Sequence, residues 1–254
     1  MAINIRLGAL LGPITDASAT HALADQARVF VGEGFESLWS AHGVGRGSML
    51  TDPFIALTVA ASVTEDVEIG SAIIQTPLYP AIDLAHKVLS LQQLCGDRLI
   101  LGVGAGSTEK DFDAYGRDYA SRFKGFYESI KLLREGYIAG TEANAALSPW
   151  PGMECPRLFF GTWGAGVERA ATEFDGWIAS GHYRSVEDLR EAFARYKTAG
   201  GGRSIVSTII LDKDTDLGAL KERFAAYADI GFDDAVIMIF PGGPSAAEVR
   251  RLLD

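Results

Sequence analysis

The residues best suited to chemistry stand where an apolar segment meets three alternating glycines. Residues 98–104 read as a buried strand, and Gly102, Gly104 and Gly106 occupy every second position along and just after it. A polar segment able to start a helix follows. Glycine has no Cβ, so another group can approach its backbone closely. A strand that ends this way before a helix is typical of sites where α/β proteins bind anionic or planar ligands.

Two histidines, His42 and His182, each follow a strand-like segment and are the candidate catalytic residues. An imidazole titrates near neutrality and can transfer a proton. A hydrogen-bonded histidine on the rim of a site is the competing interpretation of each. The sequence contains no HxH or HExxH spacing and no supported Ser-His-Asp set, so no metal site is expected.

Composition restricts the classes of partner. The 254 residues carry a formal net charge of −10 and two cysteines, Cys95 and Cys155. Because no basic block is present, we expect binding neither to nucleic acid nor to an anionic membrane. No apolar run reaches the roughly 20 residues that span a bilayer. No signal peptide is evident, and two distant cysteines fit a reducing cytoplasm, although a single disulfide stays an alternative.

Apolar segments that read as strands alternate with segments that read as helices along the whole chain. The predicted strands cover residues 3–11, 36–41, 67–76, 98–104, 157–161, 176–180, 204–211 and 235–240. The predicted helices cover residues 21–33, 80–96, 109–115, 120–137, 165–174 and 216–230, with three more that begin at Asp52-Pro53, Ser185 and Ser245 as N-caps. Residues 138–156 are predicted to be irregular.

Eight strands, each followed by a helix, predict one α/β domain over residues 1–254, a (β/α)8 TIM barrel. Several strands are apolar throughout, as expected where both faces of a parallel sheet are covered. A doubly wound sheet that binds NAD(P) at residues 102–106 is the alternative. It places its glycine loop in the first βα unit and not the fourth, and its fingerprint is GxGxxG and not GxGxG.

The active sites of TIM barrels lie at the carboxyl ends of the strands, so the residues at the ends of the predicted strands form the predicted site. The residues concerned are Leu10 and Gly12, Ala41 and His42, and residues 74–76, 103–107, 161–164, 180–182, 210–212 and 240–243. Glycine, aromatic and small apolar residues dominate this set, and it contains no carboxylate pair. Such a site suits a flat organic cofactor that carries the chemistry itself.

The order of these segments resembles the bacterial luciferase-like monooxygenase superfamily, TIM-barrel enzymes that use flavin or the deazaflavin F420. The segments concerned are residues 34–39, Asp52-Pro53, 67–72, 98–112, Arg122, Glu128, 160–162, 175–178 and 227–231. They cover nearly the whole chain. Each segment alone is weakly specific, the segment at 98–112 is fairly specific, and the ordered set is a strong signal.

The resemblance implies a cofactor site at the ends of the first, third and fourth strands. The ring would lie near Leu10, Ala72, Ile73 and Ile74, with a non-proline cis peptide between Ala72 and Ile73, and beside Gly104, Ala105, Gly106 and Ser107. The loop of Gly161, Thr162, Trp163 and Gly164 would bind the phosphate at a helix N-terminus. A plain strand-to-helix turn is the competing interpretation of this loop.

Three departures from the family pattern matter. Ala41 stands where many relatives have a carboxylate before the histidine, which puts the catalytic role of His42 in question. Ala105 stands where luciferase has a phosphate-binding arginine, so Arg122 or the loop at 161–164 must supply that contact. Only 23 residues separate Tyr137 from Gly161. This short segment predicts a compact barrel with an open mouth, or a lid from a second subunit.

The leading hypothesis is therefore an FMNH2-dependent monooxygenase of a small organic substrate, with a flavin reductase as a partner. F420-dependent hydride transfer is the first alternative, since its fold and loops would be nearly the same. A non-catalytic flavin-binding barrel is the second. A homodimer is expected, because relatives are often dimers and an open mouth needs cover.

Overall fold

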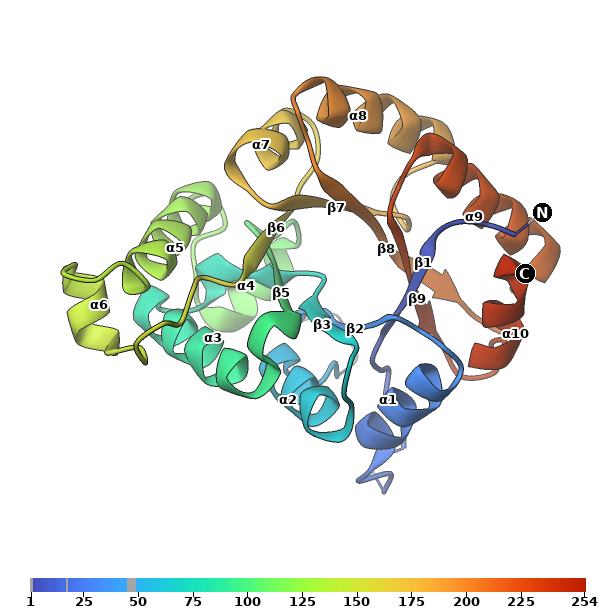
Figure 1. Ribbon diagram of the computed structural model, residues 1–254, viewed down its shortest axis with the longest axis horizontal. Coiled ribbons are helices and arrows are strands. Elements are labelled where there is room, and N and C mark those ends of the chain that lie inside the picture. The colour runs from blue at the N-terminus through green and yellow to red at the C-terminus, as the bar shows by residue number, and fades with distance from the viewer. Residues whose placement is uncertain (1, 17, 45–48) are drawn as a thin grey trace.

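Parallel strands close into a barrel with the helices outside it (Figure 1). The computed structural model describes residues 2–16, 18–44 and 49–254. The strands are β1 (Arg6–Leu10), β2 (Ser37–Ser40), β3 (Glu68–Ser71), β4 (Ile74–Gln75), β5 (Leu99–Gly104), β6 (Arg157–Gly161), β7 (Gly176–Ser180), β8 (Arg203–Leu211) and β9 (Asp234–Ile239). β3 and β4 are two pieces of one strand, and both pair with β5. This pairing closes the ring β3-β2-β1-β9-β8-β7-β6-β5, which confirms the eight-stranded TIM barrel and removes the doubly wound alternative.

Except for α6, the helices lie where the sequence pattern predicts them. They are α1 (Ala22–Gly32), α2 (Pro53–Val63), α3 (Ala81–Cys95), α4 (Glu109–Tyr115), α5 (Arg122–Gly136), α6 (Glu142–Leu147), α7 (Gly166–Glu173), α8 (Val186–Thr198), α9 (Leu217–Ile230) and α10 (Ala246–Arg250). The three predicted N-caps are confirmed: Asp52 accepts from the N–H groups of Phe54 and Ile55, and Ser185 and Ser245 form capping boxes. No helix in the described ranges is long and apolar enough to cross a membrane.

Two local predictions were wrong. Residues 138–156 are not wholly irregular, because they contain α6: the side chain of Thr141 accepts from the N–H of Asn144 and caps this short helix. The Asn144 amide in turn donates to the carbonyl of Gly136, 2.8 Å away, and ties α6 to α5. The predicted strand 67–76 is interrupted between Ser71 and Ile74 and ends in a 3-10 turn, η1 (Thr76–Leu78). The peptide between Ala72 and Ile73 is cis, as the family resemblance implies.

The core has two layers. One cluster lies between the strands and the helices, and the other fills the inside of the barrel. The inner cluster consists of Leu10, Trp39, Ala72, Ile100, Phe159, Ile178, Ile205, Val236 and Met238. Successive side chains of a strand point to opposite faces, so Ile178 belongs to the inner cluster and Ala179 to the outer one. The layers together hold each strand end at a fixed place on the barrel rim.

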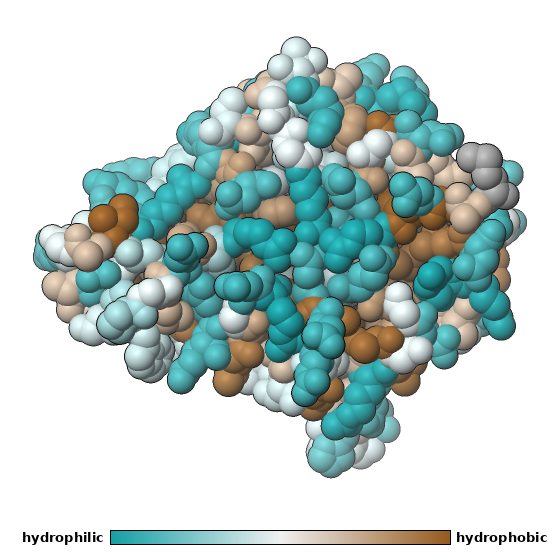
Figure 2. All heavy atoms as spheres, in the orientation of Figure 1, coloured by the Kyte–Doolittle hydropathy of each residue, from teal (hydrophilic) through white to brown (hydrophobic). Residues whose placement is uncertain are grey.

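Ion pairs occupy the end of the barrel at which the strands begin. Glu68 pairs with Arg6 at 2.8 Å, with Arg157 at 2.9 Å and with Arg203 at 2.6 Å. Arg203 also pairs with the fully buried Asp234 at 2.8 Å. These five residues are the first residues of β1, β3, β6, β8 and β9. In Figure 2, hydrophilic side chains gather over the middle of the barrel. The strand carboxyl ends form the opposite rim, which we call the mouth.

Candidate active site at the barrel mouth

The inner wall of the mouth is apolar. Leu10 on β1 and Met238 on β9 are buried members of the inner cluster, and so is Ala72, which follows β3. Ile73, on the far side of the cis peptide, is half-buried and packs against the same cluster. This surface, which we call the floor, offers a flat molecule apolar contact.

The glycines around the floor make room for the protein's own side chains. A Cβ added to Gly161 would lie 2.4 Å from Cγ2 of Ile73, and one added to Gly104 would lie 2.4 Å from Cδ1 of the same residue. A Cβ on Gly106, whose φ is +83°, would lie 2.4 Å from Oε1 of Gln75. Close packing of β3 and β4 against β5 and β6 therefore explains these glycines, and Ile73 covers Gly104 and Gly161.

The two candidate histidines lie on opposite sides of the mouth. His42 follows β2 and is 6% exposed; its Nε2 lies 3.1 Å from the hydroxyl of Tyr115, and its ring lies 5.2 Å from that of Tyr79. His182 follows β7, is exposed, and contacts the ring of its neighbour Tyr183. Three strands separate β2 from β7 in either direction round the ring. The structure therefore does not bring the two histidines together.

Several polar residues surround His42, and the sequence did not predict this arrangement. The Gln75 amide donates to the carbonyl of His42 at 3.0 Å and to the carboxylate of Asp111 at 2.6 Å. Asp111 lies on α4 and is fully buried. Burial and the charges of Asp52 and Asp111 raise the pKa of Tyr115, so Tyr115 is protonated at neutral pH. Its hydroxyl thus stays available for the hydrogen bond with His42.

The predicted phosphate loop, residues 161–164, leads into α7. A Cβ on Gly166 would lie 2.0 Å from Oγ1 of Thr162, so the Thr162 hydroxyl lies against the start of the helix. The carbonyl of Thr162 accepts from the Trp177 indole at 3.1 Å, and that of Gly164 accepts from Arg195. The guanidinium of Arg184 covers the ring of Trp163. Protein contacts on its carbonyls thus fix this loop, which is a condition for binding an anion through its N–H groups.

Arg122, the other predicted phosphate contact, lies beside the loop after β5. Its guanidinium stacks on the ring of Tyr119 at 3.9 Å, and the Tyr119 hydroxyl donates to the carbonyl of Ser107 at 3.1 Å. The buried Nε of Arg122 has no hydrogen-bond partner within residues 2–16, 18–44 and 49–254. Its Nη1 donates to the carbonyl of Tyr119 at 3.0 Å, and the ring of Phe123 lies 4.6 Å from the guanidinium. The cation is therefore held in place, while its Nε donor stays unused.

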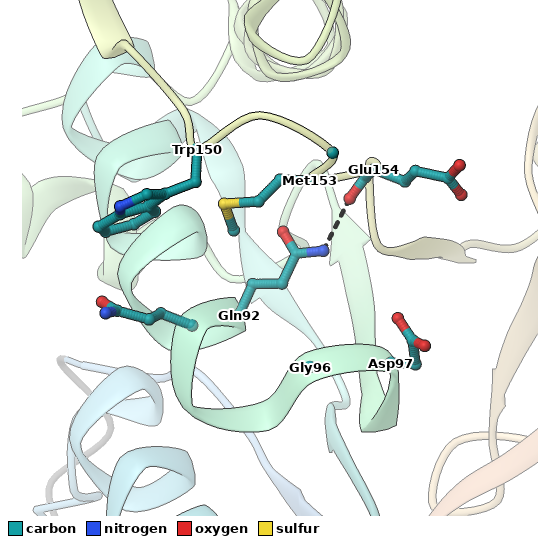
Figure 3. Close-up of a pocket in the computed structure, with 8 residues that line it drawn as sticks. Gln92, Gly96, Asp97, Trp150, Met153 and Glu154 are labelled. Atoms are coloured by element: carbon teal, nitrogen blue, oxygen red, sulfur yellow. Dashed lines mark hydrogen bonds between the residues drawn. The ribbon is translucent and has the colours of Figure 1, made fainter.

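A separate hollow of about 550 Å³ lies away from the mouth (Figure 3). Gly96 and Asp97 come just before β5, and Met153 and Glu154 come just before β6, so this hollow belongs to the strand-start side. The side chains of Trp150 and Met153 project over the end of α3, where the Gln92 amide donates to the carbonyl of Glu154 at 2.7 Å. It shares no lining residue with the predicted site.

A closed α/β barrel with an apolar floor, a buried histidine and a stacked arginine at its mouth has the form of a barrel enzyme that relies on an organic cofactor. The sequence profile of the family described as luciferase-like monooxygenase matches residues 7–210. The chain belongs to this family of flavin- and F420-dependent oxidoreductases, which confirms the resemblance.

Two curated relatives illustrate the match. The chain is 28% identical over 127 residues to the 4-hydroxyprotoasukamycin monooxygenase of Streptomyces nodosus subsp. asukaensis, covering 49% of this chain and 34% of the relative. It is 30% identical over 119 residues to the 5,10-methylenetetrahydromethanopterin reductase of Methanolobus tindarius, covering 46% and 34%. The chain thus spans about a third of the length of these two relatives.

Solved structures confirm the fold. The monooxygenase RslO1 from Streptomyces bottropensis matches with a TM-score of 0.75 at 17% identity, over 98% of this chain and 97% of that one. An F420-dependent secondary alcohol dehydrogenase matches with a TM-score of 0.81 at 14% identity, over 98% of both chains. The FMN complex of the oxygenating constituent of 3,6-diketocamphane monooxygenase from Pseudomonas putida matches with a TM-score of 0.68 at 16% identity, over 89% and 72%.

Proposed function

We propose that this protein is an FMNH2-dependent monooxygenase of a small organic substrate. The observation that carries the choice of FMN is Arg122, a single stacked guanidinium with an unused buried donor beside the loop after β5. One fixed cation suits the single phosphate of FMN. The tail of F420 carries several carboxylates besides its phosphodiester, so binding that tail by charge would require further cations.

The residues present fit this cofactor. The apolar floor of Leu10, Ala72 and Ile73 would support the ring, with Gly104 to Ser107 along its edge, and Arg122 or the loop at 161–164 would hold the phosphate. Reduced flavin, when bound, supplies the activation of oxygen. The role of the chain is to orient the ring, to keep water away from it through the apolar wall, and to place a proton carrier nearby.

His42 is the proton carrier that the geometry favours over His182. It is buried at the mouth, while its ring is held by Tyr79 and Tyr115. His182 is exposed, and within the described residues its ring contacts only the ring of the next residue, Tyr183. An imidazole held at a defined place can accept and return a proton near neutral pH.

F420-dependent hydride transfer is the second candidate. The structural match to an F420-dependent secondary alcohol dehydrogenase, with a TM-score of 0.81, supports this candidate. The apolar floor would accept a deazaflavin ring as readily as a flavin ring. The monooxygenase proposal requires a separate flavin reductase that supplies FMNH2. For the monooxygenase and for the F420-dependent enzyme alike, we propose that the protein is a homodimer.

Titration of the purified chain with FMN, riboflavin and F420, followed by fluorescence, tests this function. We expect FMN to bind more tightly than riboflavin, because only FMN carries the phosphate. Arg122→Gln should remove this preference by weakening FMN about tenfold, the loss of a charge-assisted hydrogen bond. Arg190→Gln, on the exposed face of α8, serves as the matched control. Binding of F420 without binding of FMN would overturn the proposal.

A further inference from the structure

Two serine hydroxyls at the mouth, those of Ser180 and Ser207, are buried without a hydrogen-bond partner in the described part of the chain. Ser180 is the last residue of β7, Ser207 lies on β8, and the two are direct neighbours in the parallel ladder. Ser207 is 1% exposed. A buried hydroxyl that makes no hydrogen bond costs free energy. A pair of them in one place therefore points to a polar partner that binds there, a water molecule or a ligand group.

Both hydroxyls face the inside of the barrel. Side chains alternate along a strand, and Ile178 and Ile205, two positions before each serine, belong to the inner cluster. Ala179 and Val206, one position before each serine, belong to the outer cluster. Adjacent strands lie about 4.8 Å apart, so both hydroxyls can reach a single bound molecule.

The main chain that carries the pair is fixed. The carbonyl of Ser207 accepts from the N–H of Gly181 at 2.7 Å, and the carbonyl of Gly181 accepts from Arg223 at 2.7 Å. Thr208, with a φ of +61°, then interrupts the regular pairing of β8 with β9. The main chain that carries the two hydroxyls near the mouth is thus fixed, so binding there would not need to order it.

The residues around Ser180 and Ser207 favour an uncharged ligand group. The inward side chains next to the pair on β7, β8 and β9 are Ile178, Ile205 and Met238, all apolar. A charged ligand group would lose its hydration there without gaining a counter-charge. A serine hydroxyl can donate to a carbonyl oxygen and can both donate to and accept from an alcohol.

The pair also lies opposite the floor. Three strands separate β8 from β3 in either direction round the ring, so Ser207 faces Ala72 and Ile73 across the mouth. A cofactor ring supported by Ile73 leaves the side of β7 and β8 for the molecule on which it acts.

We propose that Ser180 and Ser207 form the polar subsite of the substrate pocket, and that the substrate presents to them an uncharged carbonyl or alcohol oxygen. The assignment to the substrate rests on the proposed function, which places the cofactor against the floor. The subsite itself is a property of this chain alone.

The first test is thermal unfolding of the chain without ligand. Ser180→Ala and Ser207→Ala each remove an unsatisfied buried group, so we expect the Tm to stay the same or to rise. Ser62→Ala is the matched control, since its hydroxyl bonds only within its own helix. A clear fall in Tm for both mouth variants would show that the hydroxyls are structural and would overturn the proposal.

The second test is ligand-observed NMR with cyclohexanone, cyclohexanol and methylcyclohexane, on the chain with and without FMN. We expect the two oxygenated probes to bind more tightly than the hydrocarbon, and each mouth variant to weaken them about threefold to tenfold, the effect of one neutral hydrogen bond. Equal binding of all three probes, or unchanged binding to both variants, would overturn the subsite. Because the probes are also measured without FMN, a failure of FMN to bind counts against the proposed function only.

Discussion

The hydroxyl of Tyr115, at the end of α4, lies 3.1 Å from Nε2 of His42, which follows β2. The two residues are 73 positions apart in the sequence, and the barrel brings them together because β2 and β5 both border β3. This contact, together with the ring of Tyr79, orients His42, whose preceding residue, Ala41, carries no carboxylate.

The first prediction concerns this contact. Tyr115→Phe removes the hydroxyl and keeps the ring, so we expect turnover with FMNH2 to fall about threefold to tenfold, since a neutral hydrogen bond contributes about 0.5–1.5 kcal/mol. The ¹⁵N signal of Nε2 in His42 should move in the same variant, which gives a readout that does not depend on activity. Tyr183→Phe, next to the exposed His182, should change neither quantity. An unmoved Nε2 signal in Tyr115→Phe would contradict the role given to this tyrosine.

The second prediction concerns the packing of Ile73 against Gly161. Gly161→Ala places a methyl group 2.4 Å from Cγ2 of Ile73, so we expect it to lower the free energy of unfolding by about 1–3 kcal/mol, as overpacking does. Adding Ile73→Ala should recover part of the loss, because every close contact of the new methyl is with Ile73. Urea denaturation measures both.

Gly32→Ala is the matched control for this pair, since a Cβ there meets nothing within 4 Å. It should leave stability unchanged or slightly raised. If the double variant is as unstable as the sum of its single changes, the contact between Ile73 and Gly161 is not the cause.

The third prediction concerns the acid stability of the strand-start end. Burial alone would raise the pKa of Glu68, but the hydrogen bond and charge of Arg203, together with Arg6, lower it to about 2 from an ordinary value of 4.5. The Glu68 carboxylate contributes fully to the free energy of unfolding above pH 4.5, and this contribution is lost as the pH falls toward 2. After allowing for solvent screening, the loss amounts to on the order of 1–3 kcal/mol.

Measured unfolding free energies at pH 5, 4, 3 and 2 test this claim. Glu68→Gln should be less stable than the wild type at pH 5 and should show a shallower fall between pH 4.5 and 2. Glu187→Gln, an exposed residue of α8, should keep the wild-type slope. Parallel curves for Glu68→Gln and the wild type would refute the assignment.

The fourth prediction concerns the two free thiols. Burial raises the pKa of both Cys95 and Cys155 to about 11. The thiolate is the reactive form, so only about one thiol in a thousand is reactive at pH 8. The native chain should therefore react with a thiol reagent such as Ellman's reagent far more slowly than the chain in guanidinium chloride. Equal rates in the two states would contradict the burial of both sulfurs.

The sequence predicted the fold well for reasons that can be named. Strands buried on both faces appear as continuous apolar runs, and β6 and β7 have the predicted limits, 157–161 and 176–180. Local capping chemistry marked Asp52, Ser185 and Ser245, because a cap and the N–H groups that it satisfies lie within one turn. The strand-end rule then identified the mouth without knowledge of any contact.

The contacts of the candidate site could not be predicted in the same way. Asp111, Tyr79 and Tyr115 look like ordinary helix and turn residues, and only the closed barrel shows that they surround His42. Ser207 was missed because β8 continues to Leu211, past the irregularity at Thr208, so the end of the apolar run lies beyond the residue that faces the mouth. The glycines were correctly placed at a strand end, but Ile73 fills the space above two of them.

The ion pairs that join Arg6, Glu68, Arg157, Arg203 and Asp234 have a kinetic consequence. They cover one end of the barrel, and the inner cluster fills the space between that end and the mouth, so ligands reach the site only from the mouth. Two molecules that react at the mouth must therefore enter from the same side. The one that lies deeper has to arrive first and depart last. A barrel sealed in this way favours a compulsory order of binding, which initial-rate measurements with both ligands varied would reveal as a sequential ordered pattern.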